Sequence, residues 1–158
     1  MKKIQSILII PDIRSAQNVG SLFRTADAVG ISKIYITGYS PTPLDKYGRK
    51  RKDISKTALG AEDSIPWEYQ ESLPILIKKL KKEGYSIVAL EQDKDSVDYK
   101  AFKTPEKFAL ILGTEVTGVT KDILKECDTI IEIPMKGKKE SLNVAVSFGI
   151  AIFRILNI

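Results

Sequence analysis

Runs of consecutive apolar, β-branched residues alternate with helical stretches along almost the whole chain. We expect strands at residues 6–10, 33–37, 86–90, 108–112 and 129–133, and helices at residues 16–29, 73–83, 121–127 and 143–156. Uninterrupted apolar strands are buried on both faces, so the sequence predicts an α/β fold: one domain over residues 1–158, its mostly parallel sheet covered by helices on both faces. Ligands bind such sheets beyond the carboxyl ends of the strands. The informative loops therefore follow Ile10, Leu90, Leu112 and Ile133.

The residue types that the chain lacks exclude several kinds of chemistry. It contains no histidine, which excludes a Ser-His-Asp or Cys-His nucleophile, histidine-bound metals and a histidine general base. The single cysteine, Cys127, excludes an internal disulfide and a cysteine-based zinc cluster. No apolar run approaches the roughly 18 residues that a membrane span needs. We therefore expect a cytoplasmic protein with no metal and no membrane partner.

The chain is basic, because 25 lysines and arginines outweigh 20 aspartates and glutamates and give a net charge of +5. This balance favours a polyanionic partner, although lysine-rich surfaces are also common without one. A long loop at residues 38–53 contains four consecutive cations, Arg49, Lys50, Arg51 and Lys52. Asp45 and Asp53 cannot neutralise all four, and nothing nearby in the sequence offers more acid. The cations therefore need either an anion or the full solvation of an ordinary surface loop.

The last predicted helix is apolar on nearly every side. From Val144 to Leu156 its only polar or charged side chains are Ser147 and Arg154. A helix of this kind must be covered on more than one side. We expect a second copy of the chain to cover it in a homodimer, and burial within one subunit is the alternative.

Three local features permit both a structural and a functional interpretation. The loop at residues 113–120 has the glycine spacing of a phosphate-binding loop, but Val119 stands where that motif needs its lysine. Ser141 and Asn143 stand where residues that cap a helix are commonly found. Gly20 costs the first helix about 1 kcal/mol relative to alanine, which either close backbone packing or a ligand would justify.

These segments together resemble the three motifs of the SpoU/TrmH branch of the SPOUT RNA methyltransferases. The segment from Asn18 to Arg24, followed by Gly30, resembles the first motif, NxGxxxR…G. An apolar strand followed by Gly113, Glu115 and Gly118 resembles the second, lxlGxExxGl. Residues 133–147 are similar to the third, IPMxgxxxSLNVavA, and residues 57–62 to the small-residue segment between the first two. The motifs occur in order and at the family's spacing, so the resemblance spans nearly the whole chain.

The resemblance implies transfer of a methyl group from S-adenosylmethionine to a ribose 2′-hydroxyl in tRNA or rRNA. It implies a deep trefoil knot near the C-terminus, which general folding rules would not propose. It also implies a homodimer with the active site near the interface. Because the chain lacks the separate N-terminal RNA-binding domain of some relatives, we expect target choice to reside in this domain. We favour tRNA over rRNA, since a small enzyme suits a compact substrate.

The same resemblance assigns roles to particular residues. The catalytic positions are Asn18, Arg24, Glu115, Ser141 and Asn143. The cofactor positions are Leu90, Gly113, Ile133, Pro134, Met135 and Leu142, with backbone groups of Gly113, Ile133 and Leu142 holding the adenine and ribose. The arginine of the first motif is often described as the base, but a guanidinium is effectively always protonated. We therefore interpret Arg24 as a phosphate clamp and charge stabiliser, and Glu115 or a water-mediated route as the proton acceptor.

In this interpretation the partner of the basic loop is RNA. We predict that Arg49, Lys50, Arg51 and Lys52 contact RNA phosphates. Two other functions remain open from the sequence. One is a nucleotide-dependent phosphotransferase that uses the loop at residues 113–120, which Val119 disfavours. The other is a non-catalytic RNA-binding module, against which the complete set of five catalytic positions argues.

Overall fold

The computed structural model describes residues 3–158 and contains a seven-stranded sheet in which every strand pairing is parallel. The strands are β1 (Gln5–Pro11), β2 (Lys33–Thr37), β3 (Trp67–Gln70), β4 (Ser86–Leu90), β5 (Val97–Asp98), β6 (Lys107–Leu112) and β7 (Thr129–Glu132). The helices are α1 (Ala16–Val29), α2 (Lys52–Ala58), α3 (Ala61–Ser64), α4 (Leu73–Lys82), α5 (Lys121–Glu126) and α6 (Val144–Leu156). The strand order is β3-β2-β1-β6-β4-β7-β5, so all carboxyl ends meet at one edge.

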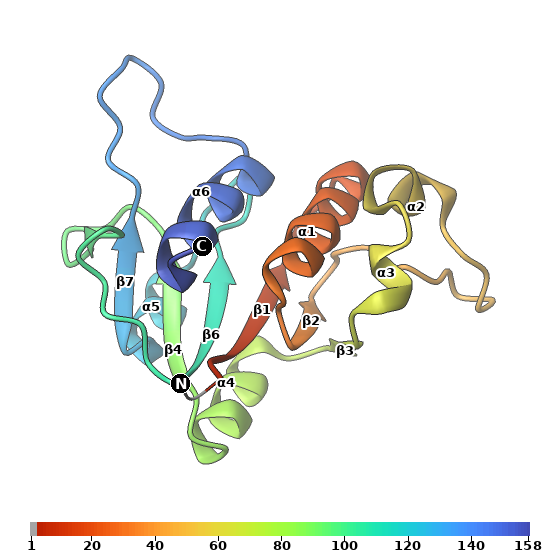
Figure 1. Ribbon diagram of the computed structural model, residues 1–158, viewed down its shortest axis with the longest axis horizontal. Helices are drawn as coiled ribbons and strands as arrows, with labels where there is room; N and C mark the ends of the chain where they lie inside the picture. Colours follow the sequence, from red (N-terminus) through yellow and green to blue (C-terminus); the bar gives the residue numbers. More distant parts are fainter. Residues whose placement is uncertain (1–2) are drawn as a thin grey trace.

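The uninterrupted apolar strands separate two cores, one on each face of the sheet. Side chains such as Leu8 of β1 are buried with Phe23 of α1 and Phe148 of α6 on one face. The next residue along β1, Ile9, points to the other face and is buried with Leu80 of α4 and with α5. Figure 1 shows α1 and α6 in front of the sheet and α4 and α5 behind it. The predicted helix-covered parallel sheet is confirmed.

The expected strands and helices all form, each within one residue of the predicted ends. The prediction missed β3, β5, α2 and α3. It was also wrong about the length of the basic loop, because α2 begins at Lys52 and takes the last two residues of the expected loop. Both missed strands lie at the ends of the sheet order, where a strand needs only one partner.

The packing of α1 against α2 explains why a glycine stands inside α1. A Cβ atom on Gly20 would lie 2.0 Å from Thr57 Oγ1 and 2.4 Å from the carbonyl oxygen of Ile54. Thr57 Oγ1 also donates a hydrogen bond of 2.9 Å to the carbonyl oxygen of Gln17. Gly20 is therefore required by close backbone packing rather than by a ligand.

The last helix returns across the sheet to pack against α1. Its N-cap is Asn143, whose Oδ1 accepts hydrogen bonds from the backbone N–H groups of Ala145 and Val146 at 2.9 and 3.2 Å. Near its other end, Thr104 in the connection between β5 and β6 donates a 2.5 Å hydrogen bond to the Ile155 carbonyl. Over the described residues, none of the helices combines the length and apolar character needed to cross a membrane.

Candidate active site

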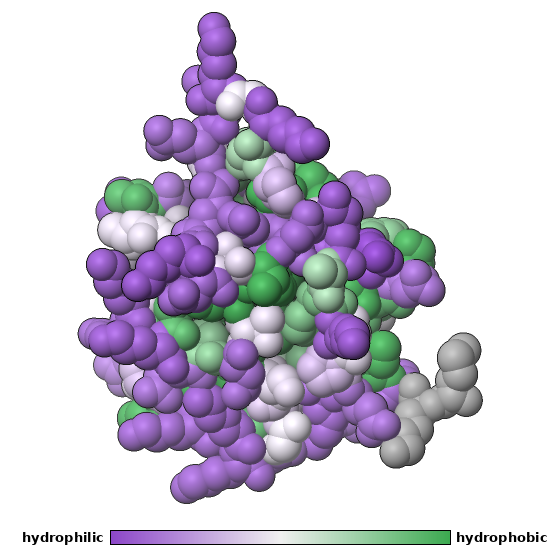
Figure 2. Space-filling model, turned by 90° about the vertical axis from the view of Figure 1, so that its left-hand side faces the viewer, coloured by the Kyte–Doolittle hydropathy of each residue, from purple (hydrophilic) through white to green (hydrophobic). Residues whose placement is uncertain are grey.

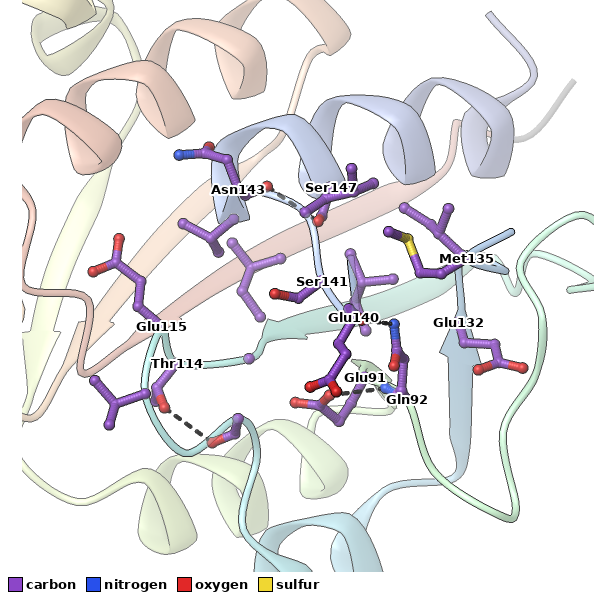
Figure 3. Close-up of a pocket in the computed structure, with 18 residues that line it drawn as sticks. Glu91, Gln92, Thr114, Glu115, Glu132, Met135, Glu140, Ser141, Asn143 and Ser147 are labelled. Carbon is purple, nitrogen blue, oxygen red and sulfur yellow. Dashed lines mark hydrogen bonds between the residues drawn. The ribbon is translucent and has the colours of Figure 1, made fainter. Parts of the chain in front are cut away.

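A cavity of about 520 Å³ opens beyond the carboxyl ends of β4, β6 and β7, against the first turn of α6. Its walls are the three loops that follow these strands, as the strand-end rule predicts. Eight of the predicted site residues line it: Leu90, Gly113, Glu115, Ile133, Met135, Ser141, Leu142 and Asn143. Figure 3 shows Glu115 on one side of the cavity, Asn143 at the start of α6 and Ser141 between them. Three segments far apart in the sequence thus form a single site.

Asn18, Glu115 and Asn143 form a connected polar group at the rim of this cavity. The Asn18 Nδ2 group donates a hydrogen bond to Glu115 Oε1, and Asn143 Nδ2 donates one of 3.2 Å to Asn18 Oδ1. Because the Asn143 Oδ1 atom is occupied in capping α6, its amide orientation is fixed. Asn143 therefore caps α6 and also lines the cavity, so its capping role is confirmed and its catalytic role stays a prediction.

The cavity is acidic although the chain is basic. Four glutamates line it, and none of the lining residues is lysine or arginine: the four are Glu91, Glu115, Glu132 and Glu140. The loop at residues 133–143 carries lysines, but they are exposed and lie outside the lining. In Figure 2 this loop forms the hydrophilic projection at the top of the face shown. A cationic ligand would be attracted into this cavity, whereas a polyphosphate would be repelled.

Glu91 is a site residue that sequence reasoning missed. Its Oε2 atom accepts a 2.9 Å hydrogen bond from the backbone N–H of Val119. A Cβ atom on Gly113 or Gly118 would lie 2.6 or 2.3 Å from that same oxygen, and Gly118 has a φ of +64°. Both glycines are therefore needed for the loop to close over the Glu91 carboxylate. Its position directly after Leu90, at the carboxyl end of a strand, is the feature from which the sequence could have predicted it.

The same contact explains why the loop at residues 113–120 is not a phosphate-binding loop. The carboxylate of Glu91 lies against Gly113 and Gly118, the two glycines that gave the loop its phosphate-loop spacing. The turn is held further by Thr114, whose Oγ1 accepts from the Thr117 N–H at 3.1 Å and donates to the Gly118 carbonyl at 3.1 Å. An anion would have to displace this carboxylate.

A second link joins two walls of the cavity. Gln92, which follows Glu91, donates from Nε2 to the Glu140 carbonyl oxygen at 2.7 Å. This hydrogen bond joins the loop after β4 to the loop after β7. Nothing in the sequence pattern indicated this pair, because the two residues lie 48 positions apart.

Two predicted site residues lie away from the cavity. Arg24 is exposed on α1, about 9 Å along the helix axis from Asn18, and does not line the cavity. Pro134 is also exposed and outside the lining, between Ile133 and Met135. The structure of one chain thus brings together four of the five predicted catalytic residues and leaves Arg24 apart.

The basic loop is better neutralised than its sequence suggests. Arg49 pairs with Asp45 at 3.2 Å and Arg51 with Asp53 at 2.6 Å. Lys50 pairs at 2.5 Å with Asp63 of α3. This further acid is not near the four cations in the sequence, and it is the fold that brings Asp63 back to the loop. All of these ion pairs are partly exposed, so their contribution to stability is small.

Comparison with known proteins identifies the family. The sequence pattern described as the SpoU rRNA Methylase family matches residues 5–153. The 23S rRNA (guanosine-2′-O-)-methyltransferase RlmB of Salmonella typhi is 31% identical over 147 residues, which are 93% of this chain and 58% of that protein. The chain thus spans a little over half the length of this curated relative.

Solved structures agree with the sequence comparison. The AdoMet-bound rRNA methyltransferase from Sinorhizobium meliloti superposes with a TM-score of 0.87 and 25% identity, over 97% of this chain and 56% of that chain. The TrmH/SpoU tRNA modifying enzyme from A. aeolicus superposes with a TM-score of 0.83 and 26% identity, over 99% and 76% of the two chains. The predicted α/β fold with its C-terminal knot is confirmed. The chain therefore belongs to the SpoU rRNA Methylase family.

Proposed function

We propose that the chain transfers a methyl group from S-adenosylmethionine to a ribose 2′-hydroxyl of RNA. The observation that carries the proposal is a separation of charge: four glutamates and no cation line the cavity, whereas the whole chain has a net charge of +5. S-Adenosylmethionine carries a sulfonium and an ammonium group against one carboxylate, so an acidic cavity attracts it. RNA is a polyanion that the basic exterior attracts. A nucleoside triphosphate would be repelled by the same glutamates, which disfavours the phosphotransferase.

The cofactor is proposed to occupy the cavity between the loops after β4, β6 and β7. Backbone groups of Gly113, Ile133 and Leu142 would hold its adenine and ribose, while Met135 and Leu90 supply apolar walls. The cavity volume of about 520 Å³ falls within the range of small-molecule sites. The AdoMet-bound rRNA methyltransferase from Sinorhizobium meliloti supports this assignment through its similarity to the chain.

The reaction requires positioning and a proton acceptor. S-Adenosylmethionine, when bound, supplies an electrophilic methyl group. The ribose oxygen forms a bond to this carbon as the carbon–sulfur bond breaks, and the hydroxyl proton passes to an acceptor. Glu115 is proposed as this acceptor, directly or through water, because Asn18 holds its carboxylate at the cavity rim. Asn143 holds Asn18 in turn, and Ser141 lines the wall beside them.

The RNA is proposed to lie outside the cavity, across the start of α1 and the basic loop. Arg24, further along α1, would clamp a phosphate of this RNA. The four consecutive cations of the loop would make further phosphate contacts, for which Arg49, Lys50 and Arg51 would exchange their present carboxylate partners for phosphate. Replacing Arg49, Lys50, Arg51 and Lys52 by serine should weaken binding of all RNA sequences alike and lower the salt slope by about 0.7–0.9 per lost contact. An unchanged affinity and slope would show that these residues form only a solvated loop.

A homodimer through α6 completes the proposal. The side of α6 that faces away from the sheet exposes Val146, Ile150 and Phe153, with 50%, 39% and 39% of their surface accessible. A second copy covering this face would remove contiguous apolar surface from water. Preference for tRNA over rRNA remains a prediction, since similar proteins include both a 23S rRNA methyltransferase and a tRNA modifying enzyme.

Two experiments test the proposal. Calorimetry should show binding of S-adenosylmethionine and none of ATP, and tight ATP binding without a response to S-adenosylmethionine would overturn it. Incubation with S-adenosylmethionine and unmodified total RNA, followed by mapping of new 2′-O-methyl groups, should then reveal the target. Methyl groups found only in rRNA would contradict the tRNA preference while supporting the reaction.

A further inference from the structure

Two exposed tyrosines on the loop after β2 each lie against cationic side chains. Tyr39 and Tyr47 expose 55% and 68% of their surface. The Arg14 Cζ atom lies 5.6 Å from the centre of the Tyr39 ring, and Lys46 Nζ and Arg49 Cζ lie 5.1 and 4.9 Å from that of Tyr47. We propose that these five residues form a stacking platform for unpaired RNA bases next to the target ribose. This inference rests on the proposed function and specifies the form of its substrate.

Tyr47 is held in place by a folded loop. Asp45 Oδ1 accepts hydrogen bonds from the backbone N–H groups of Tyr47 and Arg49 at 2.8 and 2.9 Å. These bonds, that of Arg49 first, hold the pKa of Asp45 below its usual value. Leu44 and Lys50 are bridged across the loop in an antiparallel sense. The loop that carries the ring is therefore already ordered, so little conformational freedom is lost when RNA binds.

Tyr39 is anchored at the ends of β1 and β2. Its backbone N–H donates to Asp12 Oδ1 at 3.0 Å. The next residue, Ser40, is buried, and its Oγ accepts from the Ile13 N–H at 2.8 Å and donates to the Ile10 carbonyl at 3.2 Å. The backbone that carries Tyr39 is thus fixed to the strand end that precedes Arg14.

The strand order aligns the Arg14 and Tyr39 part of this platform with the active site. Because β2, β1 and β6 are neighbours in that order, their carboxyl ends present Tyr39, Arg14 and Glu115 in a row. Adjacent strands are about 4.8 Å apart, so β2 and β6 are about 10 Å apart. A single RNA strand entering the site at Glu115 would therefore pass Arg14 and Tyr39 within a few nucleotides.

Phosphate binding alone does not account for the two rings. Lysines and arginines suffice for phosphates, whereas exposed aromatic rings stack on bases that have left a helix. In an A-form duplex the bases are stacked on each other, and the major groove is too narrow for side chains. The combination of rings and cations fits the two components of a single strand, base faces and phosphates. The target ribose is therefore expected in a loop, bulge or end.

Binding of two RNA probes tests the inference. One is a single strand of about twelve nucleotides, within the site sizes of known single-strand binders, and the other is that strand annealed to its complement. Tyr39→Ala and Tyr47→Ala should each weaken single-strand binding roughly five- to a hundredfold and change duplex binding by less than about twofold. Tyr47→Phe, which keeps the ring, should bind like the unchanged protein. Lys46→Ser should weaken both probes alike and lower the salt slope by about 0.7–0.9.

The outcomes separate this inference from the proposed function. Tyrosine variants that bind both probes normally, or that weaken both equally, would overturn the stacking platform. Calorimetry with S-adenosylmethionine and methylation of total RNA by the unchanged protein are measured alongside. If these two fail, the proposed function fails; if they succeed while the tyrosine variants bind normally, only the stacking platform is refuted.

Discussion

Replacing Gly20 by alanine is expected to destabilise the fold, although alanine is the better helix former. Ordinary van der Waals contact begins near 3.4 Å, and the new Cβ would lie 2.4 Å from the Ile54 carbonyl oxygen. A backbone atom cannot rotate away, so α2 would have to move by about 1 Å relative to α1. The shift would also break the hydrogen bond from Thr57 Oγ1 to the Gln17 carbonyl.

The magnitude follows from three contributions. Overpacking against backbone costs about 3 kcal/mol, the upper part of the usual range. Loss of the Thr57 hydrogen bond costs about 1 kcal/mol, and the helix propensity of alanine returns about 1 kcal/mol. The free energy of unfolding should therefore fall by about 3 kcal/mol. For a chain of this length that corresponds to a melting temperature lower by roughly 6–12 °C.

Thermal and urea unfolding followed by circular dichroism measure this change. The matched control is Ser21→Ala, the next residue of α1, which is half-exposed and should change the free energy of unfolding by less than about 0.5 kcal/mol. Well below the melting temperature, Gly20→Ala should keep its affinity for S-adenosylmethionine. Equal or higher stability of Gly20→Ala would refute the packing argument. A selective loss of affinity for S-adenosylmethionine would show that Gly20 is needed for ligand binding.

Three further results are expected. Arg24→Ala should leave S-adenosylmethionine affinity unchanged in calorimetry and lower methyl transfer about a hundredfold or more, with poor rescue by Arg24→Lys, because a point charge cannot replace the guanidinium fork; near-normal turnover would make Arg24 structural. Phe153→Asp should convert a dimer into a monomer of 17.6 kDa in light scattering, and an unchanged protein that is already monomeric at micromolar concentration contradicts the dimer. Burial raises the pKa of Cys127 to about 11 from 9.0, so at pH 8 a thiol reagent should modify it about a hundredfold more slowly than a model thiol and faster as the pH rises towards 11; a rate equal to that of the model thiol would contradict this burial.

The sequence predicted those parts of the fold that have a strong local pattern. The long apolar strands fall within a residue of their predicted ends because burial on both faces demands an uninterrupted apolar run, and α1 does so because its apolar residues recur at helical spacing. β3 has the sequence WEYQ at the edge of the sheet, and β5 has two residues. α2, with the sequence KDISKTA, owes its position to packing against Gly20. Such short, polar elements form because of tertiary partners that no local pattern records.

The site residues also separate into those that a sequence pattern predicts and those that depend on tertiary contacts. Asn18, Glu115, Ser141 and Asn143 were found because their motifs resemble those of a family. Glu91 was missed because its importance lies in a contact with Gly113 and Gly118, which are distant in the sequence, and the ion pair of Lys50 with Asp63 was missed for the same reason. A pattern along the chain predicts which residues stand at strand ends. It does not predict which of them meet.

The insertion of β6 between β1 and β4 determines when the active site can form during folding. Gln5 of β1 pairs with Lys107 of β6, so this ladder joins segments about a hundred residues apart. Such long-range parallel pairing slows folding. On a ribosome adding 5–20 residues per second, β1 would wait roughly 5–20 s for its partner, while the pairs of β1 with β2 and of β2 with β3 can already form. The cavity, which needs the loops after β6 and β7 and the start of α6, is complete only at the end. A ligand that binds there therefore selects fully folded chains and stabilises the segment that folds last.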